Sequence, residues 1–283
     1  MHTLYDVPAP AKLNLFLHIT GQRPDGYHLL QSVFMLIDLC DTLHFERRPG
    51  SALSREDLSD PLPADDLALR AARALQQATG CMLGAHIGVH KRIPAQAGMG
   101  GGSSDAATTL LALNRLWNLQ LDLPQLRRIG LGLGADVPFF LCGGNAWVEG
   151  IGDIITPLEN AWQLPKARFV VVKPEAGLET KQIFSSPFLK RDSQPATISG
   201  FAAAHYDFGR NDLQNVAQQL CPEVQQAIDW LAGHGMHGRM TGSGSAVFAA
   251  MPQTAELSHI PRGWKVRTCE NLAVHPLAEW SAR

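Results

Sequence analysis

The chain has 283 residues, of which 45% are hydrophobic and 18% charged, and its formal net charge is −2. This balance is typical of a globular protein with a real core and excludes an intrinsically disordered one. Because the charge is near zero and forms no acidic or basic tail, we expect neither nucleic acid nor an anionic membrane as a partner.

The sequence also gives expectations about location. No apolar run reaches the roughly 18 residues that a membrane span needs. The opening residues, Met1–Asp6, lack the basic and apolar regions of a signal peptide. The five cysteines are scattered and form no CxxC pair, so neither a disulfide framework nor a zinc site is expected. We therefore predict a cytoplasmic protein.

The first half of the chain predicts a mixture of strands and helices. Apolar and other residues alternate over 12–19, which indicates a strand, and one of its faces carries Lys12 and Asn14 together. The further elements expected here are strand 33–45, a helix over 65–79 that ends at Gly80, strand 85–93, helices 103–117 and 124–133, and strand 145–149.

An irregular segment over 150–164 suggests a domain boundary. Beyond it we expect a strand over 168–173, a short helix that carries Thr180 and Phe184, and a helical stretch over 211–231 that Pro222 interrupts. A glycine-rich turn and a strand follow over 240–250. Because no regular βαβ rhythm is present, the sequence predicts an α+β fold with domains 1–155 and 156–283.

A glycine-rich loop between a predicted strand and a predicted helix is the strongest local signal. Glycines allow close approach of the backbone to a ligand, and a helix start offers free N–H groups and a partial positive charge. Together they predict a cradle for phosphates. Its residues are Pro94, Ala95, Gln96, Ala97, Gly98, Met99, Gly100, Gly101, Gly102, Ser103 and Ser104.

The same loop has other possible interpretations. No lysine follows the glycines, so it is not a Walker A loop, and Ser103 stands where GxGxxG needs its third glycine. A dehydrogenase is therefore disfavoured. A flexible loop that ends in a serine cap remains the alternative without function.

Asp136 lies in the apolar segment Gly134–Phe140, where a carboxylate is costly unless it is paired. Lys12 is its natural partner because it also needs a counter-charge. Alone, Asp136 would be interpreted as an ordinary turn residue. His86 and His90 share a strand face, but no carboxylate lies between them as in HExxH, so we do not expect a metal site there.

Aromatic side chains suggest a site for a planar base. The turn Arg23–His28 contains Pro-Asp-Gly, after which Tyr27 and His28 project. Phe184 shares a helix face with Thr180 and could form the second side of a base sandwich, although a core role is the simpler alternative. Thr241–Ser245 is a second glycine–hydroxyl loop, either a hairpin turn or part of the phosphate site.

Three motifs occur in the order of the GHMP kinase superfamily: Pro10–Leu15, the loop Pro94–Ser104, and Met240–Phe248. The chain resembles this superfamily over nearly its whole length. The turn Arg23–His28 and the segment Gly134–Phe140 make it similar to the branch of diphosphocytidyl-methylerythritol kinases. Residues 185–210 are the least recognisable part.

The resemblance implies a two-domain α+β fold with the active site in the cleft between the domains. It implies transfer of the γ-phosphoryl group of ATP, with Mg²⁺, to the 2-hydroxyl of a diphosphocytidyl-methylerythritol in the non-mevalonate isoprenoid pathway. By the same resemblance, Asp136 is the base, Lys12 polarises the reacting centre, and the substrate contacts are Asn14, Tyr27, His28, Lys91, Thr180 and Phe184. Asp65 or Asp66 would lie near the adenosine. The resemblance assigns no protein ligand to the metal.

Two other functions remain open at this point. A GHMP kinase that acts on homoserine, mevalonate or a sugar would keep the same loop, but the Tyr27–His28 pair favours a substrate with a base. A nucleotide-binding protein without turnover would not need both Lys12 and Asp136.

Overall fold

The protein is described by a computed structural model that covers residues 2–280. Its strands are β1 (Thr3–Gln22), β2 (His28–Arg48), β3 (Leu53–Asp57), β4 (Gly84–His90), β5 (Ala146–Glu149), β6 (Ile154–Pro157), β7 (Arg168–Lys173), β8 (Arg239–Met240), β9 (Val247–Ala250) and β10 (Lys265–Glu270). Its α-helices are α1 (Leu67–Thr79), α2 (Gly101–Leu116), α3 (Leu123–Leu131), α4 (Val137–Phe140), α5 (Thr180–Phe184), α6 (Ile198–Ala202), α7 (Gln214–Leu220) and α8 (Pro222–Gly233). Short 3-10 helices lie at Asn160–Trp162 and His205–Asp207.

Each strand and helix predicted from the sequence is present, and the α+β class is confirmed. Helix α1 begins where the Asp66 carboxylate accepts a hydrogen bond from Leu69 N, and it ends at Gly80, whose φ of 67° is left-handed. The predicted helical stretch over 211–231 is split into α7 and α8, because Pro222 stands at the first turn of α8.

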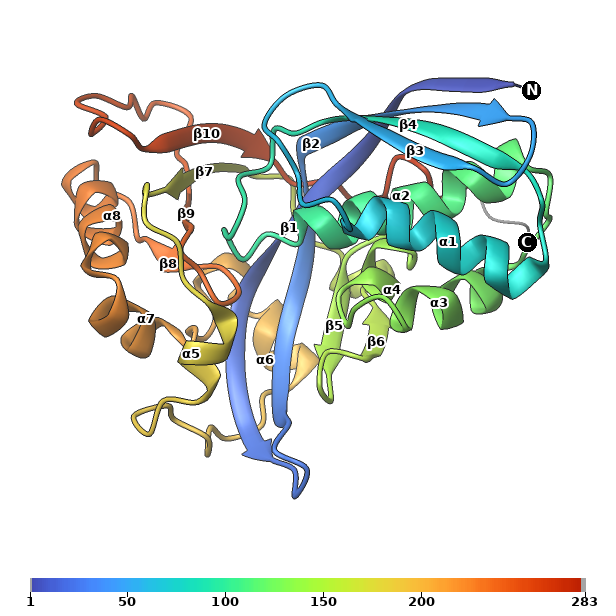
Figure 1. The fold of residues 1–283 in the computed structure, drawn as a ribbon. Helices are drawn as coiled ribbons and strands as arrows, with labels where there is room; N and C mark the ends of the chain where they lie inside the picture. Colours follow the sequence, from blue (N-terminus) through green and yellow to red (C-terminus); the bar gives the residue numbers. More distant parts are fainter. Residues whose placement is uncertain (1, 281–283) are drawn as a thin grey trace.

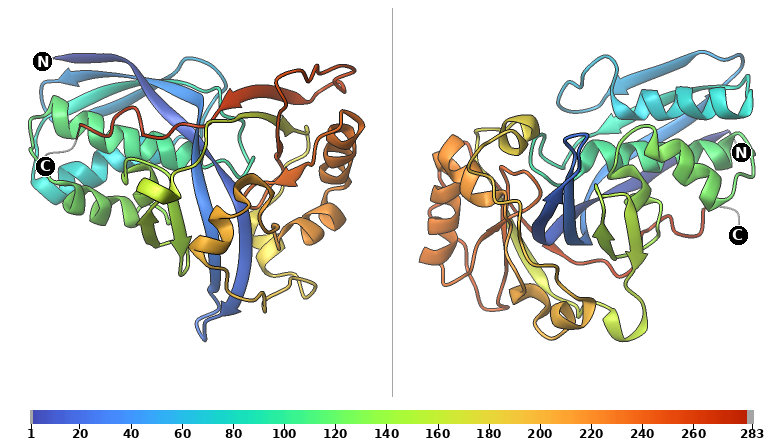
Figure 2. Two further views of the ribbon diagram at one scale, coloured as in Figure 1. Left: turned by 180° about the vertical axis from the view of Figure 1, so that it is seen from behind. Right: turned by 90° about the horizontal axis from the view of Figure 1, so that it is seen from below.

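The strands form two sheets. The larger sheet has the order β3-β4-β2-β5-β6, and β1 pairs with β2. The smaller sheet is antiparallel, with the order β10-β7-β9-β8. Figure 1 shows the long β1–β2 hairpin running down between two halves: helices α1–α4 lie on one side, and the smaller sheet with α7 and α8 lies on the other. The same separation is visible from behind and from below (Figure 2).

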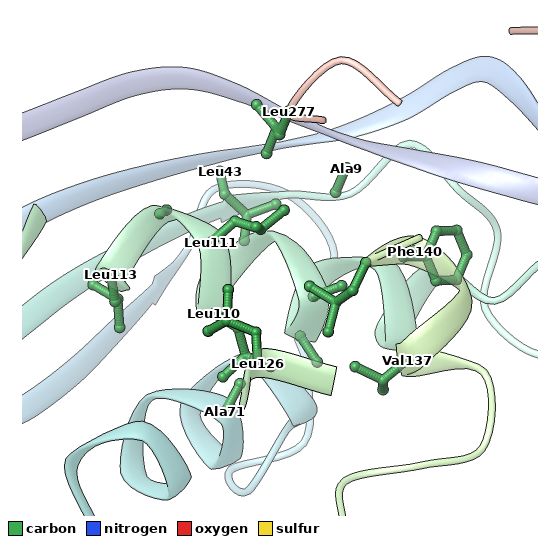
Figure 3. Close-up of a cluster of buried hydrophobic side chains, with 14 of the residues drawn as sticks. Ala9, Leu43, Ala71, Leu110, Leu111, Leu113, Leu126, Val137, Phe140 and Leu277 are labelled. Carbon is green, nitrogen blue, oxygen red and sulfur yellow. The ribbon is translucent and has the colours of Figure 1, made fainter. Parts of the chain in front are cut away.

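The hydrophobic core follows this division. One cluster lies between the larger sheet and helices α1–α4, and Figure 3 shows part of it around Leu110, Leu111 and Leu126. A second cluster joins Leu13 and Leu15 of β1 to residues of β7 and β9. Residues 9–17 of β1 are therefore buried on both faces, and the face with Lys12 and Asn14 is as enclosed as the aliphatic face.

The two halves are not simple consecutive stretches of chain. The expected boundary between residues 155 and 156 falls inside β6, which pairs with β5 of the larger sheet. After β10 the chain returns to the first half, where Asn271 bridges Ile37 and Val274 bridges Gly144. Leu277 then joins the core under the larger sheet (Figure 3). The division 1–155 and 156–283 stays a prediction.

Among residues 2–280, none of the helices combines the length and the apolar character needed to cross a membrane.

Candidate active site

The three sequence motifs meet in space. Lys12 N donates a hydrogen bond of 3.0 Å to Met99 O, and Ser245 N donates one of 3.1 Å to Gln96 O. The contact between the two glycine-rich loops is so close that a Cβ atom on Gly98 would lie 2.2 Å from Thr241 O. These segments line a cleft of about 910 Å³ between the two halves of the molecule.

Helix α2 begins inside the glycine run, two residues before the predicted start. Its N-cap is Gly100, which has a φ of 71° and provides no side-chain cap. In the described part of the chain, the N–H groups of Gly101, Gly102 and Ser103 have no acceptor. An uncapped helix start with free N–H groups is suited to an anion, and the role of this loop as a phosphate cradle stays a prediction.

Lys12 and Asp136 lie together at the cleft. The Lys12 ammonium, on a side chain that is only 4% exposed, is 3.7 Å from Asp136 Oδ2 and lies over the ring of Phe34. Burial lowers the pKa of Lys12, and the Asp136 carboxylate opposes this shift. The predicted pairing of these two charges is therefore confirmed. Asp136 is less enclosed than its apolar neighbours suggested, because its side chain is 33% exposed toward the cleft.

Asn14 holds Lys12 in place. Its Oδ1 accepts a hydrogen bond from Lys12 Nζ, and its Nδ2 donates one of 3.0 Å to Ser32 Oγ. Its backbone N–H donates to Thr241 Oγ1 at 2.9 Å. Most of its hydrogen-bonding capacity is thus used within the protein, although it lines the cleft. A substrate contact through Asn14 stays a prediction.

Lys91 lies beside the glycine loop and lines the cleft. Its ammonium donates to Asp41 Oδ2 and, at 2.5 Å, to Asp105 Oδ2. Asp41 Oδ1 also accepts from the backbone N–H groups of Arg92 and Ile93. Burial of the Asp105 carboxyl raises its pKa to about 7. The structure therefore places Lys91 in a buried charge cluster at the loop and at the wall of the cleft, and its contact with the diphosphocytidyl substrate stays a prediction.

The aromatic residues line a second pocket of about 710 Å³. Tyr27 is 59% exposed, and the rings of His28 and Phe184 have centroids 5.1 Å apart. Phe184 and Leu30 line both this pocket and the larger cleft, so the two are continuous. Thr180 exchanges a hydrogen bond of 2.7 Å with Ser243. The structure thus brings the predicted aromatic residues together next to the cleft.

Other candidates have structural partners. Asp66 caps α1 and pairs with Arg55, and Asp65 pairs with Arg73, while both aspartates line the cleft. Residues 2–280 contain no group of three or more His, Cys, Asp or Glu side chains that could hold a metal ion.

Three residues of the site were not predicted from the sequence. Asp41 and Asp105 flank the glycine loop in space, but nothing in their spacing connects them with Lys91. Arg191 lies in the least recognisable stretch and contacts His28. The one available signal was the charge of Lys91, which needs a partner wherever it is buried.

The fold agrees with comparisons to known proteins. The model of the GHMP kinases N terminal domain matches residues 66–144, and that of the GHMP kinases C terminal domain matches residues 195–267. A mevalonate kinase from Methanococcus jannaschii has the same fold at 14% identity, with a TM-score of 0.65 over 96% of this chain and 99% of that one. The chain is a GHMP kinase by class.

Closer relatives define the family. The 4-diphosphocytidyl-2-C-methyl-D-erythritol kinase of Acidovorax sp. (strain JS42) is 71% identical over 99% of both chains. The kinase of the same name from Delftia acidovorans is 69% identical over 99% of this chain and 98% of its own. A crystal structure of 4-(cytidine 5'-diphospho)-2C-methyl-D-erythritol kinase superposes with a TM-score of 0.75 at 31% identity, over 93% of this chain and 98% of that one. The chain belongs to the 4-diphosphocytidyl-2-C-methyl-D-erythritol kinases.

Proposed function

We propose that this kinase transfers the γ-phosphoryl group of ATP to the 2-hydroxyl of 4-diphosphocytidyl-2-C-methyl-D-erythritol, a step of non-mevalonate isoprenoid biosynthesis. The observation that carries the proposal is the Lys12–Asp136 pair, which lies in one cleft with the uncapped start of α2 and opens toward the aromatic pocket. One continuous surface thus offers a phosphate site, a base and a base-binding pocket.

The glycine loop and the start of α2 would bind the polyphosphate of ATP. The free N–H groups of Gly101, Gly102 and Ser103 donate to phosphate oxygens, and the helix dipole favours their negative charge. We assign this role to the loop residues Pro94–Ser104. Lys91 stabilises the loop through its hydrogen bonds to Asp41 and Asp105.

We propose Mg²⁺ as the companion of ATP. The residues described here offer no carboxylate cage, but Mg²⁺ with nucleotides is commonly held by phosphate oxygens and water with few protein ligands. Ser104 at the start of α2 has a buried hydroxyl without a hydrogen-bond partner, so an oxygen donor is present beside the phosphate cradle. When bound there, the ion would neutralise phosphate charge.

Asp136 and Lys12 would act on the acceptor. Asp136, exposed to the cleft, accepts the proton of the attacking hydroxyl and orients it. The Lys12 ammonium stabilises negative charge on the transferring group, which matters because phosphoryl transfer depends mainly on positioning and charge stabilisation. Asn14 keeps the ammonium directed toward this point.

The aromatic pocket would bind the cytosine ring. We place the ring between Tyr27 and Phe184, with His28 at its polar edge, because all three residues line the second pocket. A stacked base would also cover the ring of Tyr27, which is exposed in the free protein. Thr180, on the side of α5 that meets Ser243, would contact the diphosphate or the erythritol. Homoserine, mevalonate and simple sugars have no aromatic base that could stack in this pocket. We further propose a cytoplasmic enzyme, since all five cysteines are free thiols.

The test compares two acceptors with the wild-type enzyme: the diphosphocytidyl compound and methylerythritol phosphate, which lacks cytidine. We expect efficient phosphorylation of the first only, since stacking contributes roughly 1–3 kcal/mol per base. Phe184→Ala should raise the acceptor KM roughly 5- to 150-fold, at 1.4 kcal/mol per decade, with little change in the KM for ATP. Similar efficiency with both acceptors would show that the base pocket is wrong.

A further inference from the structure

Arg191 forms hydrogen bonds with two residues of the aromatic pocket, His28 and Phe184, and with the turn that follows Phe184. Its guanidinium donates to Leu189 O at 3.0 Å, to Phe184 O at 3.2 Å and to Ser186 O at 2.9 Å. Its Nε donates to His28 Nε2 at 3.0 Å across 163 residues of sequence. Arginine suits such a task because its planar fork presents several donors in fixed directions.

The hydrogen bond to His28 determines the proton on that ring. Since Arg191 is always a donor, His28 Nε2 must accept, and a neutral imidazole then carries its hydrogen on Nδ1. Burial and then the charge of Arg191 lower the pKa of His28, which keeps the ring neutral near pH 7. Within residues 2–280, Nδ1 has no hydrogen-bond partner, and it is not among the polar atoms sealed from solvent.

The same guanidinium places the stacking partner. Phe184 is the last residue of α5, and the hydrogen bond from Arg191 holds its carbonyl. The bonds to Ser186 and Leu189 close the following turn around the guanidinium. The backbone of Phe184 and the ring of His28 are therefore both held by one side chain, which itself does not line the pocket.

We propose that Arg191 is the positioning residue for base recognition: it presents His28 Nδ1–H as a donor to an acceptor atom on the base edge and holds Phe184 for stacking. Cytosine offers such acceptors in its ring nitrogen and its carbonyl oxygen. The base itself rests on the proposed function, whereas the tautomer of His28 is a property of the free enzyme.

The first experiment measures the His28 tautomer by ¹⁵N NMR of the imidazole nitrogens in the free enzyme at pH 7.5. We expect the Nδ1–H form in the wild type and a return toward the Nε2–H form, which free histidine side chains prefer, in Arg191→Gln. Unchanged signals from the other histidines show that the variant is folded. An Nε2–H form in the wild type would overturn the proposal whatever the substrate is.

The second experiment measures binding of cytidine 5'-diphosphate by calorimetry. Arg191→Gln should weaken binding roughly 10- to 100-fold and raise the acceptor KM similarly, with the KM for ATP unchanged. Arg191→Lys keeps the positive charge but lacks the planar, forked guanidinium. We therefore expect Arg191→Lys to recover less than half of the affinity lost in Arg191→Gln, on a logarithmic scale of Kd. The matched control is Lys190→Ala, which removes a neighbouring charge that makes only an exposed ion pair with Asp192.

The outcomes separate the two ideas. Full affinity in Arg191→Gln, or full rescue by Arg191→Lys, would show that Arg191 does not position the base site. If the wild type neither binds cytidine 5'-diphosphate nor phosphorylates the diphosphocytidyl acceptor, the proposed substrate fails, while the NMR comparison still decides whether Arg191 sets the His28 tautomer.

Discussion

Lys12 carries its charge on a side chain that is almost completely buried. Its side chain is 4% exposed, and its partners are the Asn14 amide, the Asp136 carboxylate and the ring of Phe34. A buried ammonium is costly unless such partners compensate it. In return, the same charge acts strongly on a transferring phosphoryl group, because a low-dielectric site screens it little.

Asp136→Asn tests the proposed base. The substitution keeps the size and polarity of the side chain but removes the proton acceptor, so kcat should fall roughly 10²- to 10⁴-fold. The KM values for ATP and for the acceptor should stay within a few-fold. Steady-state kinetics with each substrate varied in turn gives the answer, and Asp60→Asn, on a side chain 78% exposed, is the control. Near-normal turnover in a folded Asp136→Asn protein would remove Asp136 from this role.

Single residues show what the sequence could and could not predict about the site. The Lys12–Asp136 pair was predictable because each charge stands in an apolar segment and needs the other. Lys91 also needed a partner, but its carboxylates come from β2 and α2, and no periodicity connects them. The role of Arg191 was not predictable, since its hydrogen bonds go to backbone carbonyls and to a histidine far away in the sequence.

At the scale of elements, the glycine loop is held at both ends by one charge cluster. Asp41 on β2 binds the entry of the loop through Arg92 N and Ile93 N. Lys91 extends from this entry to Asp105 on α2, just after the exit of the loop. The cluster has two carboxylates for one ammonium, and one oxygen of Asp105 is buried without a partner. One negative charge is thus in excess in a buried place.

The pH dependence of the stability of Asp105→Asn tests whether this excess negative charge is present. Because burial raises the pKa of Asp105 to about 7, its contribution to stability is present below its ordinary pKa of 3.8 and is lost as the pH rises through 7. Asparagine has no such titration. The melting temperature of Asp105→Asn relative to the wild type should therefore increase between pH 5.5 and pH 8.5. Parallel melting curves over this range would show that Asp105 does not ionise within it.

Element boundaries show a similar limit of sequence interpretation. Strand β1 extends from Thr3, well before the alternating residues, although Pro8 and Pro10 argue against a strand. A shift of register lies directly after Pro10, between Pro10 and Ala11, while Pro8 pairs in regular register with Thr42. The predicted start of α2 is later than the observed one because glycines are poor helix formers, so the sequence gives no sign that the helix begins at Gly101. In the structure Gly101 packs closely there, since a Cβ atom on it would lie 3.0 Å from the side chain of Ile93.

At the scale of the whole molecule, the chain order does not correspond to the spatial halves. Residues 271–280 follow the smaller sheet, but they lie against the larger one, and Leu272 N donates to Leu36 O at 2.9 Å. Asn145 binds both ends of this contact, through Leu36 N and Leu272 O. This return was not predicted, because a short irregular segment carries no periodic signal. The segment 271–280 is thus a second connection between the two sides of the cleft, in addition to the β1–β2 hairpin.

Leu277→Ala tests whether this final segment joins the two halves into one cooperative unit. Leu277 is 3% exposed in the core under the larger sheet, and a Leu→Ala change in such a place costs about 2–5 kcal/mol. The melting temperature should fall by several degrees in a single transition, measured by calorimetry, while the KM values for both substrates stay unchanged because Leu277 is remote from the cleft. Leu220→Ala, on a side chain 49% exposed, should have little effect. Two separate transitions, of which only one shifts to lower temperature in Leu277→Ala, would mean that the halves unfold independently. The final segment follows the second half in the chain but packs on the first half. It can therefore couple the two halves only if its contacts are lost in the same transition that unfolds both.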